Sequence, residues 1–185
     1  LVIHLCCMIP KLVVLDIAGT TVNDFGLVQK AAMNTMKEKL AVDVTLDDAN
    51  KVMGIPKKTA FEQLCSLHQV EVSAEQIDGL VFHFNERLTA QYAEKGSIEL
   101  MPHAGELFES IRACGSQVYL NTGFNRAIAD VIVQNLNLGT VLNGYIGSDE
   151  VMAGRPQPDM IRLAMKRSGV EYSHFVMKVG DTISD

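Results

Sequence analysis

The sequence lacks an excess of basic residues. Its 16 lysine and arginine residues are outnumbered by 22 aspartate and glutamate residues, which gives a formal net charge of −6. Proteins that bind nucleic acid without sequence preference carry a basic face that neutralises phosphates. We therefore expect no nucleic-acid partner, and an anionic ligand would need positive charge concentrated at one site.

Cysteine is scarce, and no apolar run is long enough to span a membrane. The apolar opening, residues 1–10, is too short for a span and has neither a basic leader nor a small-residue cleavage site. We expect a cytoplasmic protein with no membrane partner and assign no role to residues 1–7.

The cysteines lack paired metal-ligand spacing and are interpreted as buried or incidental thiols. They are Cys6, Cys7, Cys65 and Cys114.

The chain has the length and the apolar content of one α/β domain with an inserted subdomain, with 185 residues of which 48% are hydrophobic. Residues 11–16 form a continuous valine and leucine run that ends in Asp16. This pattern predicts a buried, central parallel strand with a functional loop at its carboxyl end.

Helical patterns follow this strand as far as about residue 97, and strands and helices alternate after that. In the stretch 73–95, apolar residues recur at three- and four-residue steps, as on one face of an amphipathic helix. Later strands are predicted at 117–121, 143–147 and 175–179, with helices at 125–136 and 158–168 and a helix after Pro102 that stops at Gly115. The alternation predicts a parallel sheet, and the helical stretch is an insertion into it.

Polar residues gather where the predicted strands end, which is where ligands bind in open parallel sheets. Carboxylates, hydroxyls, glycines and a guanidinium suit a phosphate-type group beside a divalent metal. Mg²⁺ prefers carboxylate and carbonyl oxygens, and arginine makes paired bonds to phosphoryl oxygens. These residues are Asp16, Gly19, Thr20, Thr122, Gly123, Arg155, Asp181 and Asp185.

In this order, the segments DIAGTTV, NTGF, GRPQPD and GDTISD resemble the four motifs of the haloacid dehalogenase (HAD) superfamily. The resemblance covers nearly all of the chain from Lys11 onward. It implies an α/β fold, with a Rossmann-like core at residues 8–24 and 98–185 and an all-helical cap at 25–97, inserted after the first strand. Cores of this superfamily continue past the fourth motif, so we expect the C-terminal part of the core to be missing and strand 175–179 to be an exposed edge.

The resemblance also implies a role for each motif residue. Asp16 would be the nucleophile that forms an aspartyl-phosphate. Thr122 would bind the phosphoryl group next to Gly19, Thr20 and Gly123, and Arg155 would take the place of the motif-three cation. Mg²⁺ would be held by Asp16, the backbone carbonyl of Ala18, Asp181 and Asp185. The expected substrate is a small phosphorylated or phosphonate metabolite.

Ala18 separates this sequence from most phosphatases of the superfamily, which carry there an aspartate that protonates the leaving alcohol. Without that acid, ester hydrolysis is expected to slow by about 10²- to 10⁴-fold. The D-x-A-G-T pattern is similar to that of the phosphonatases, or phosphonoacetaldehyde hydrolases, whose cap lysine forms a Schiff base with the substrate aldehyde. Their Met-Gly-x-x-Lys motif is matched here by Met53, Gly54 and Lys57.

Three positions depart from the phosphonatase pattern. Ala60 stands where these enzymes have a histidine, Gly26 where they have a cysteine, and Phe124 where they have an aromatic hydroxyl. The departures indicate a phosphonatase-like sister group, whose substrate need not be phosphonoacetaldehyde. A Lys57 amine that attacks a carbonyl needs a pKa well below about 10.4, and like-charge repulsion from Lys58 would help to lower it if the two ammonium groups lie close together.

Three functions remain open from sequence alone. The first is a Mg²⁺-dependent hydrolase of the phosphonatase-like group that cleaves a C–P or P–O bond through Asp16. The second is phosphonoacetaldehyde hydrolysis through a Schiff base on Lys57. The third is a truncated or degenerate phosphate-binding protein without catalysis. The oligomeric state is open as well, and a homodimer is one alternative.

Overall fold

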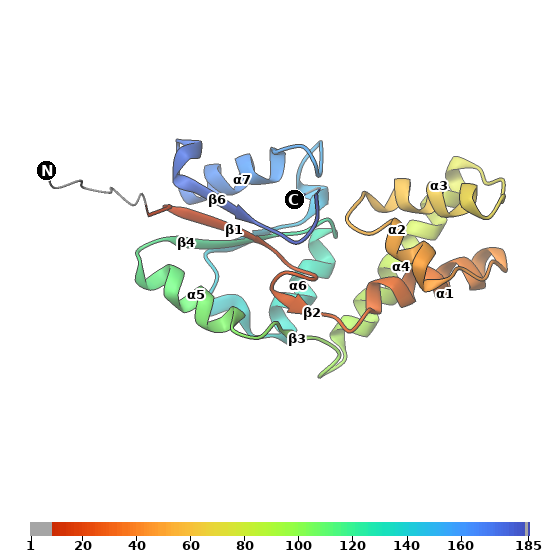
Figure 1. The fold of residues 1–185 in the computed structure, drawn as a ribbon, viewed down its shortest axis with the longest axis horizontal. Helices are drawn as coiled ribbons and strands as arrows, with labels where there is room; N and C mark the ends of the chain where they lie inside the picture. Colours follow the sequence, from red (N-terminus) through yellow and green to blue (C-terminus); the bar gives the residue numbers. More distant parts are fainter. Residues whose placement is uncertain (1–8, 184) are drawn as a thin grey trace, which may run out of the picture.

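The computed structural model describes residues 9–183 and 185, and a four-stranded parallel sheet forms the middle layer of one half of it (Figure 1). The strands are β1 (Leu12–Asp16), β4 (Gln117–Asn121), β5 (Gly144–Ile146) and β6 (Val176–Val179), in the order β5-β4-β1-β6. The central strand β1 pairs with β4 and β6, and Asp16 lies opposite Asn121 in the register. Because all four strands run in one direction, the loops at their carboxyl ends meet at a single edge.

Helices cover both faces of the sheet. Helix α7 (Asp159–Ser168) packs on the face that includes Leu12 and Val14, and α5 (Ala104–Ala113) and α6 (Arg126–Asn135) pack on the face that includes Val13 and Leu15 (Figure 1). Successive side chains of a strand point to opposite faces, so a strand covered on both sides needs apolar residues at every position. This double burial is the reason for the valine and leucine run of β1.

Four helices lie beside the sheet and contact one another (Figure 1). They are α1 (Leu27–Leu40), α2 (Leu46–Lys51), α3 (Lys57–Leu67) and α4 (Ala74–Ala93). Helix α4 begins at a capping box, in which the Gln76 amide donates to Ser73 Oγ at 3.2 Å and the Ser73 amide donates to Gln76 Oε1 at 2.8 Å. Its apolar face is buried through Ile77, Leu80, Phe84, Leu88 and Tyr92.

The chain leaves the sheet for these helices and returns from them side by side. Two short antiparallel strands, β2 (Val22–Asn23) and β3 (Glu99–Leu100), form this connection. Helix α4 also packs against α6 beneath the sheet. The side-chain amide of Asn135, in α6, donates to the backbone carbonyl oxygens of Tyr92, at 2.5 Å, and Glu94, at 3.0 Å. The helical group is therefore joined to the sheet by both a strand pair and a helix contact.

The α/β fold predicted from sequence is confirmed, and the four predicted strands match β1, β4, β5 and β6 to within one residue at each end. Strand β6 lies at one edge of the described sheet, as expected. The sequence prediction missed β2 and β3, because strands of two residues have no detectable periodicity. It also missed three single-turn 3-10 helices: Leu138–Thr140, Ser148–Glu150 and Ser173–Phe175. The residue limits given above for core and cap stay predictions.

Within residues 9–183 and 185, no helix combines the length and the apolar character needed to cross a bilayer. Of the four cysteines, Cys65 is buried and Cys114 is exposed, and both are free. Cys6, Cys7 and the extension 1–7 lie outside the described residues.

Two glycines offer a matched test of backbone packing. A Cβ added at Gly147 would lie 2.4 Å from the Arg126 backbone nitrogen, whereas one added at the exposed Gly79 of α4 would meet nothing within 4 Å. We expect Gly147→Ala to lower the free energy of unfolding by about 1–3 kcal/mol, because backbone atoms must move. Gly79→Ala should raise it by about 0.5–1 kcal/mol through helix propensity. Urea titrations followed by circular dichroism measure both, and equal effects of the two substitutions would contradict this packing.

Candidate active site at the carboxyl edge of the sheet

Asp16 lies at the carboxyl end of the central strand, with only 4% of its surface exposed. Its backbone carbonyl accepts a hydrogen bond from Thr21 Oγ at 2.8 Å, so the turn after β1 folds back on the strand end. Burial raises the pKa of the Asp16 carboxyl above its ordinary value, and the nearby Arg155 guanidinium opposes that rise. Asp16 is thus a buried carboxylate with one arginine partner.

Arg155 connects the ends of three strands. Its Nη2 donates to the Asp16 carboxylate and, at 3.0 Å, to the backbone carbonyl of Asn121 at the end of β4. Its Nη1 lies 2.8 Å from Asp185 Oδ1, beyond β6. The side chain is 10% exposed, and its Nε has no hydrogen-bond partner among the described residues. A buried guanidinium with a spare donor is suited to an anion at this edge.

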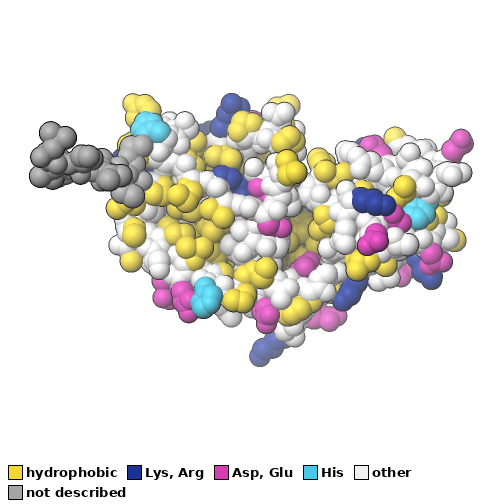
Figure 2. All heavy atoms as spheres, viewed as in Figure 1, with side chains coloured by type: hydrophobic (Ala, Val, Ile, Leu, Met, Phe, Trp, Pro, Cys, Tyr) yellow, Lys and Arg dark blue, Asp and Glu magenta, His cyan; other side chains and the backbone are white. Residues whose placement is uncertain are grey.

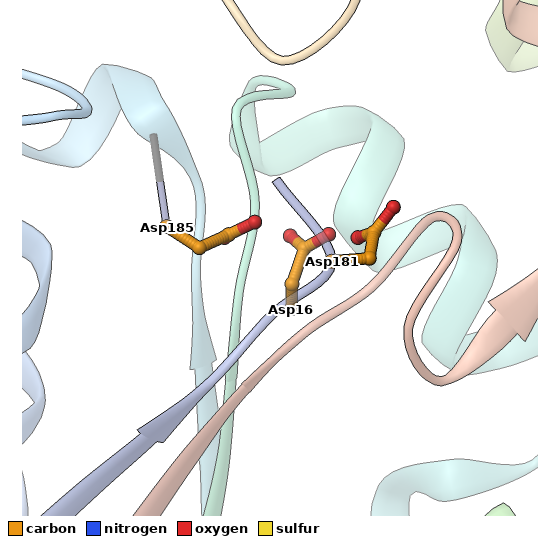
Figure 3. Close-up of side chains that lie close together, drawn as sticks. All are labelled: Asp16, Asp181 and Asp185. Atoms are coloured by element: carbon orange, nitrogen blue, oxygen red, sulfur yellow. The ribbon is translucent and has the colours of Figure 1, made fainter. Parts of the chain in front are cut away.

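Three carboxylates approach one another beside this arginine. One oxygen from each of Asp16, Asp181 and Asp185 lies within 4.8 Å of the others, and the Asp16 and Asp181 carboxylates are neighbours (Figure 3). Although burial acts in the opposite direction, hydrogen bonds from Thr182 and Lys178 hold the pKa of Asp185 below its ordinary value. The cluster is therefore acidic, and two cations, Arg155 and Lys178, pair with it.

Gly19 allows the loop after β1 to approach Asp181. Its φ of +90° lies in the region that side chains disfavour, and a Cβ there would stand 2.6 Å from Asp181 Oδ2. The next residue, Thr20, donates its hydroxyl to Asp181 Oδ1 at 2.8 Å. The Gly-Thr pair thus places Asp181 close to Asp16.

The loops that carry Thr122 and Arg155 are joined by hydrogen bonds. The Thr122 amide donates to the Ile146 carbonyl at 3.1 Å, and the Ser148 amide donates to the Phe124 carbonyl at 2.7 Å. The Arg126 amide, at the start of α6, donates to Asp149 Oδ1 at 2.7 Å. Thr122 does not cap α6, because Asn125 does so by accepting from the Ile128 amide at 3.0 Å.

A cavity of about 510 Å³ opens between the strand ends and the helical group, where the molecular surface is indented (Figure 2). This volume suits a small metabolite. Most of the predicted site residues line it: Asp16, Ala18, Gly19, Met53, Gly54, Lys57, Thr122, Gly123, Arg155 and Asp181. Thr20 and Asp185 lie behind this wall and contact Asp181 and Arg155, respectively.

Lys57 is the first residue of α3, and it lines the cavity. Its Nζ lies 5.5 Å from the centre of the Phe84 ring and 5.7 Å from that of Phe124. Burial lowers the pKa of Lys57 to about 8, and the charge of Asp24 acts in the opposite direction. The expected contribution of Lys58 is absent, because Lys58 pairs with Asp78 at 2.7 Å. The low pKa was expected, but its cause is burial.

Sequence reasoning missed two groups of cavity residues. Asn121 is the last residue of β4 and was visible in the LNTGF segment, yet it was not singled out as a partner of Arg155. Asp24, Gln29 and Asn85 line the helical side of the cavity. They belong to no motif, so only the folded structure brings them to the site.

Two curated proteins and one solved structure match most of this chain. The phosphonoacetaldehyde hydrolase of Bacillus cereus strain B4264 is 27% identical over 94% of this chain and 69% of its own length. A bifunctional phosphonoacetaldehyde hydrolase/aminoethylphosphonate transaminase of Clostridioides difficile is 29% identical over 95% of this chain, which spans only 29% of that relative. The crystal structure of a phosphonoacetaldehyde hydrolase-like protein from Oleispira antarctica superposes with a TM-score of 0.82 at 25% identity, covering 95% of this chain and 67% of that one.

A family model for the haloacid dehalogenase-like hydrolases matches residues 13–185. The match includes every motif residue that borders the cavity, from Asp16 to Asp181, and Asp185 as well. It also includes the helices between β2 and β3. The chain therefore belongs to the haloacid dehalogenase-like hydrolase family.

Proposed function

We propose that this protein is a Mg²⁺-dependent hydrolase of the phosphonatase-like group, which cleaves a phosphorus bond of a small phosphorylated or phosphonate metabolite through Asp16. The main support is one observation: a buried carboxylate at the end of the central strand faces a cavity, with an arginine on it and two further carboxylates close by. The names of the relatives in Bacillus cereus and Oleispira antarctica point to the same chemistry.

The residues present fit a Mg²⁺ ion. Three carboxylates supply the hard oxygen ligands that this ion prefers. Gly19 leaves open the space in front of Asp181 that a side chain would fill. In the proposal the ion is held by Asp16, the Ala18 carbonyl and Asp181, with Asp185 supporting it. When bound, the ion would offset repulsion between the carboxylate and an anionic substrate.

The protein's own residues account for the steps around Asp16. An Asp16 oxygen forms a bond to phosphorus. The bond between phosphorus and the leaving group breaks, and its electron pair goes to the leaving group. Water then cleaves the aspartyl-phosphate, which releases phosphate and restores the carboxylate. Arg155 orients the carboxylate, and Thr122 and Gly123 belong to the wall where a phosphoryl group would be held.

Ala18 narrows the choice of leaving group. It lies in the cavity wall and has no proton to give, so a poor alkoxide leaving group gains no help from this position. A second candidate function, phosphonoacetaldehyde hydrolysis through a Schiff base, is favoured by Lys57. Its pKa of about 8 leaves a substantial neutral fraction near neutral pH, and it shares the cavity with Asp16.

Replacement of the nucleophile is the direct test. We expect Asp16→Asn to lower kcat at least about a thousandfold with Mg²⁺ and a panel of phosphonates and phosphate esters. Asp43→Asn, at an exposed surface pair with Lys37, is the matched control and should keep full activity. Turnover that survives Asp16→Asn would exclude Asp16 as the nucleophile. Binding of Mg²⁺ and phosphate with no turnover in the parent protein would favour the non-catalytic alternative.

Metal binding can be measured without turnover. If Mg²⁺ binds the folded protein, it should stabilise it by about 2.7 kcal/mol at 100 times its dissociation constant, which thermal unfolding detects as a higher Tm. Asp181→Asn should abolish most of this rise, while Asp159→Asn, at the start of α7, should leave it intact. An equal rise in Tm for all three proteins would place the ion elsewhere.

The Schiff-base candidate has its own test. Borohydride reduction in the presence of phosphonoacetaldehyde should attach the substrate carbon skeleton to Lys57, detectable by peptide mass spectrometry. Lys57→Arg should remove the adduct, while the exposed Lys58 serves as the internal control. Absence of any adduct under conditions where the aldehyde is hydrolysed would eliminate this mechanism and leave the Asp16 assignment standing.

A further inference from the structure

Four residues from four separate segments form a series of contacts beside the cavity. Asp24 precedes α1, Tyr92 lies near the end of α4, Phe124 follows β4 and Lys57 begins α3. The Tyr92 hydroxyl donates to Asp24 Oδ2 at 3.0 Å. The Tyr92 and Phe124 rings meet edge to face with centres 6.1 Å apart, and the Phe124 ring lies beneath Lys57 Nζ. Asp24 and Lys57 line the same cavity, and the charge of Asp24 favours the ammonium form of Lys57.

Within this series of contacts, the carboxylate of Asp24 is held by several hydrogen bonds. Besides Tyr92, the amides of Gly26 and Val28 donate to its two carboxylate oxygens, at 3.1 and 3.2 Å. Three donors from two segments leave the carboxylate little freedom to rotate. Tyr92 is itself 1% exposed, and its backbone carbonyl accepts from Asn135. The negative charge of Asp24 is therefore fixed in position in the cavity wall.

Lys57 is surrounded differently. Two aromatic rings flank its ammonium group, and no carboxylate forms a direct ion pair with it among residues 9–183 and 185. The other charged side chains of the cavity wall have partners of their own. Arg155 pairs with Asp16, Lys58 with Asp78, and Asp181 accepts from Thr20. Asp24 is left as the anion that acts on Lys57 in this part of the chain.

We propose that Asp24, held in place by Tyr92, is a positioning residue that fixes the charge and orientation of Lys57 in the cavity. This assignment deepens the proposed function and rests on it only in taking Lys57 as a group that faces the substrate. It also gives a physical role to a position outside the four motifs.

The direction of the effect follows from two opposed influences. Burial favours the neutral amine, whereas a nearby fixed anion favours the ammonium form. If the negative charge is removed, the ammonium loses its stabilising partner and gives up its proton at lower pH. The neutral fraction of Lys57 at pH 7 should then rise, by about fivefold if its pKa falls by about one unit from about 8.

The experiment measures the titration of Lys57 in the full chain without substrate. Only the neutral amine reacts with acetic anhydride, so the pH dependence of acetylation, measured by peptide mass spectrometry, reports its pKa. We expect Asp24→Asn to move the Lys57 midpoint to lower pH by about one unit and to speed labelling at pH 7 about fivefold. Asparagine keeps one carbonyl oxygen that can accept from the Val28 amide in the first turn of α1, so α1 should still form.

Tyr92→Phe is the second variant. It removes the hydrogen bond to Asp24 but retains the ring contact with Phe124, so the midpoint should shift in the same direction by a smaller amount. It also carries the test alone if Asp24→Asn fails to fold. Lys58, in the same digests, should keep its rate in every variant, and the surface variant Asp43→Asn should leave Lys57 unchanged.

A Lys57 midpoint that stays the same in folded Asp24→Asn, or in Tyr92→Phe if that is the folded variant, would overturn the proposal. Because no substrate is present, this outcome is distinct from a failure of the hydrolase assignment, which the Asp16→Asn measurements decide.

Discussion

The ion pair between Arg155 and Asp16 is the interaction on which the rest of the site depends. It joins the end of β1 to a loop about 140 residues later in the chain, and the same guanidinium contacts the ends of β4 and β6. The desolvation of a buried carboxylate is unfavourable unless an opposite charge offsets it. The parallel sheet provides the geometry for that compensation, because its strand ends meet at one edge, where one arginine reaches three of them.

The sheet and the acidic edge could be predicted from sequence because their signals are local. A strand covered on both faces must be apolar at every position, so β1 was visible as a continuous run that ends in Asp16. Gly19 was predicted as a phosphate-binding residue, and the structure adds that its missing side chain makes room for Asp181. Roles in catalysis stay predictions, whereas the proximity of these side chains is a property of the fold.

The helical side of the cavity could not be predicted in the same way. Asp24 and Tyr92 are 68 residues apart and become partners only because α4 returns to the strand pair from which α1 departs. Neither residue has a sequence pattern that distinguishes it from an ordinary helix cap or core aromatic. The expectation for Lys58 was wrong for a related reason, since adjacent residues on a helix point in different directions and Lys58 finds Asp78 instead.

The hydrogen bonds between the Thr122 loop and the Ser148–Glu150 turn have a consequence for how this protein tolerates change. A substitution that displaces one of these loops must displace the other, so paired substitutions there should have strongly non-additive energies. Gln29, Met53 and Asn85 of the opposite wall lie on separate helices and loops, and within residues 9–183 and 185 none of them hydrogen-bonds to the strand-end loops. Substitutions that adapt the cavity to a new substrate are therefore expected to be tolerated more readily in the helical wall than at the strand ends.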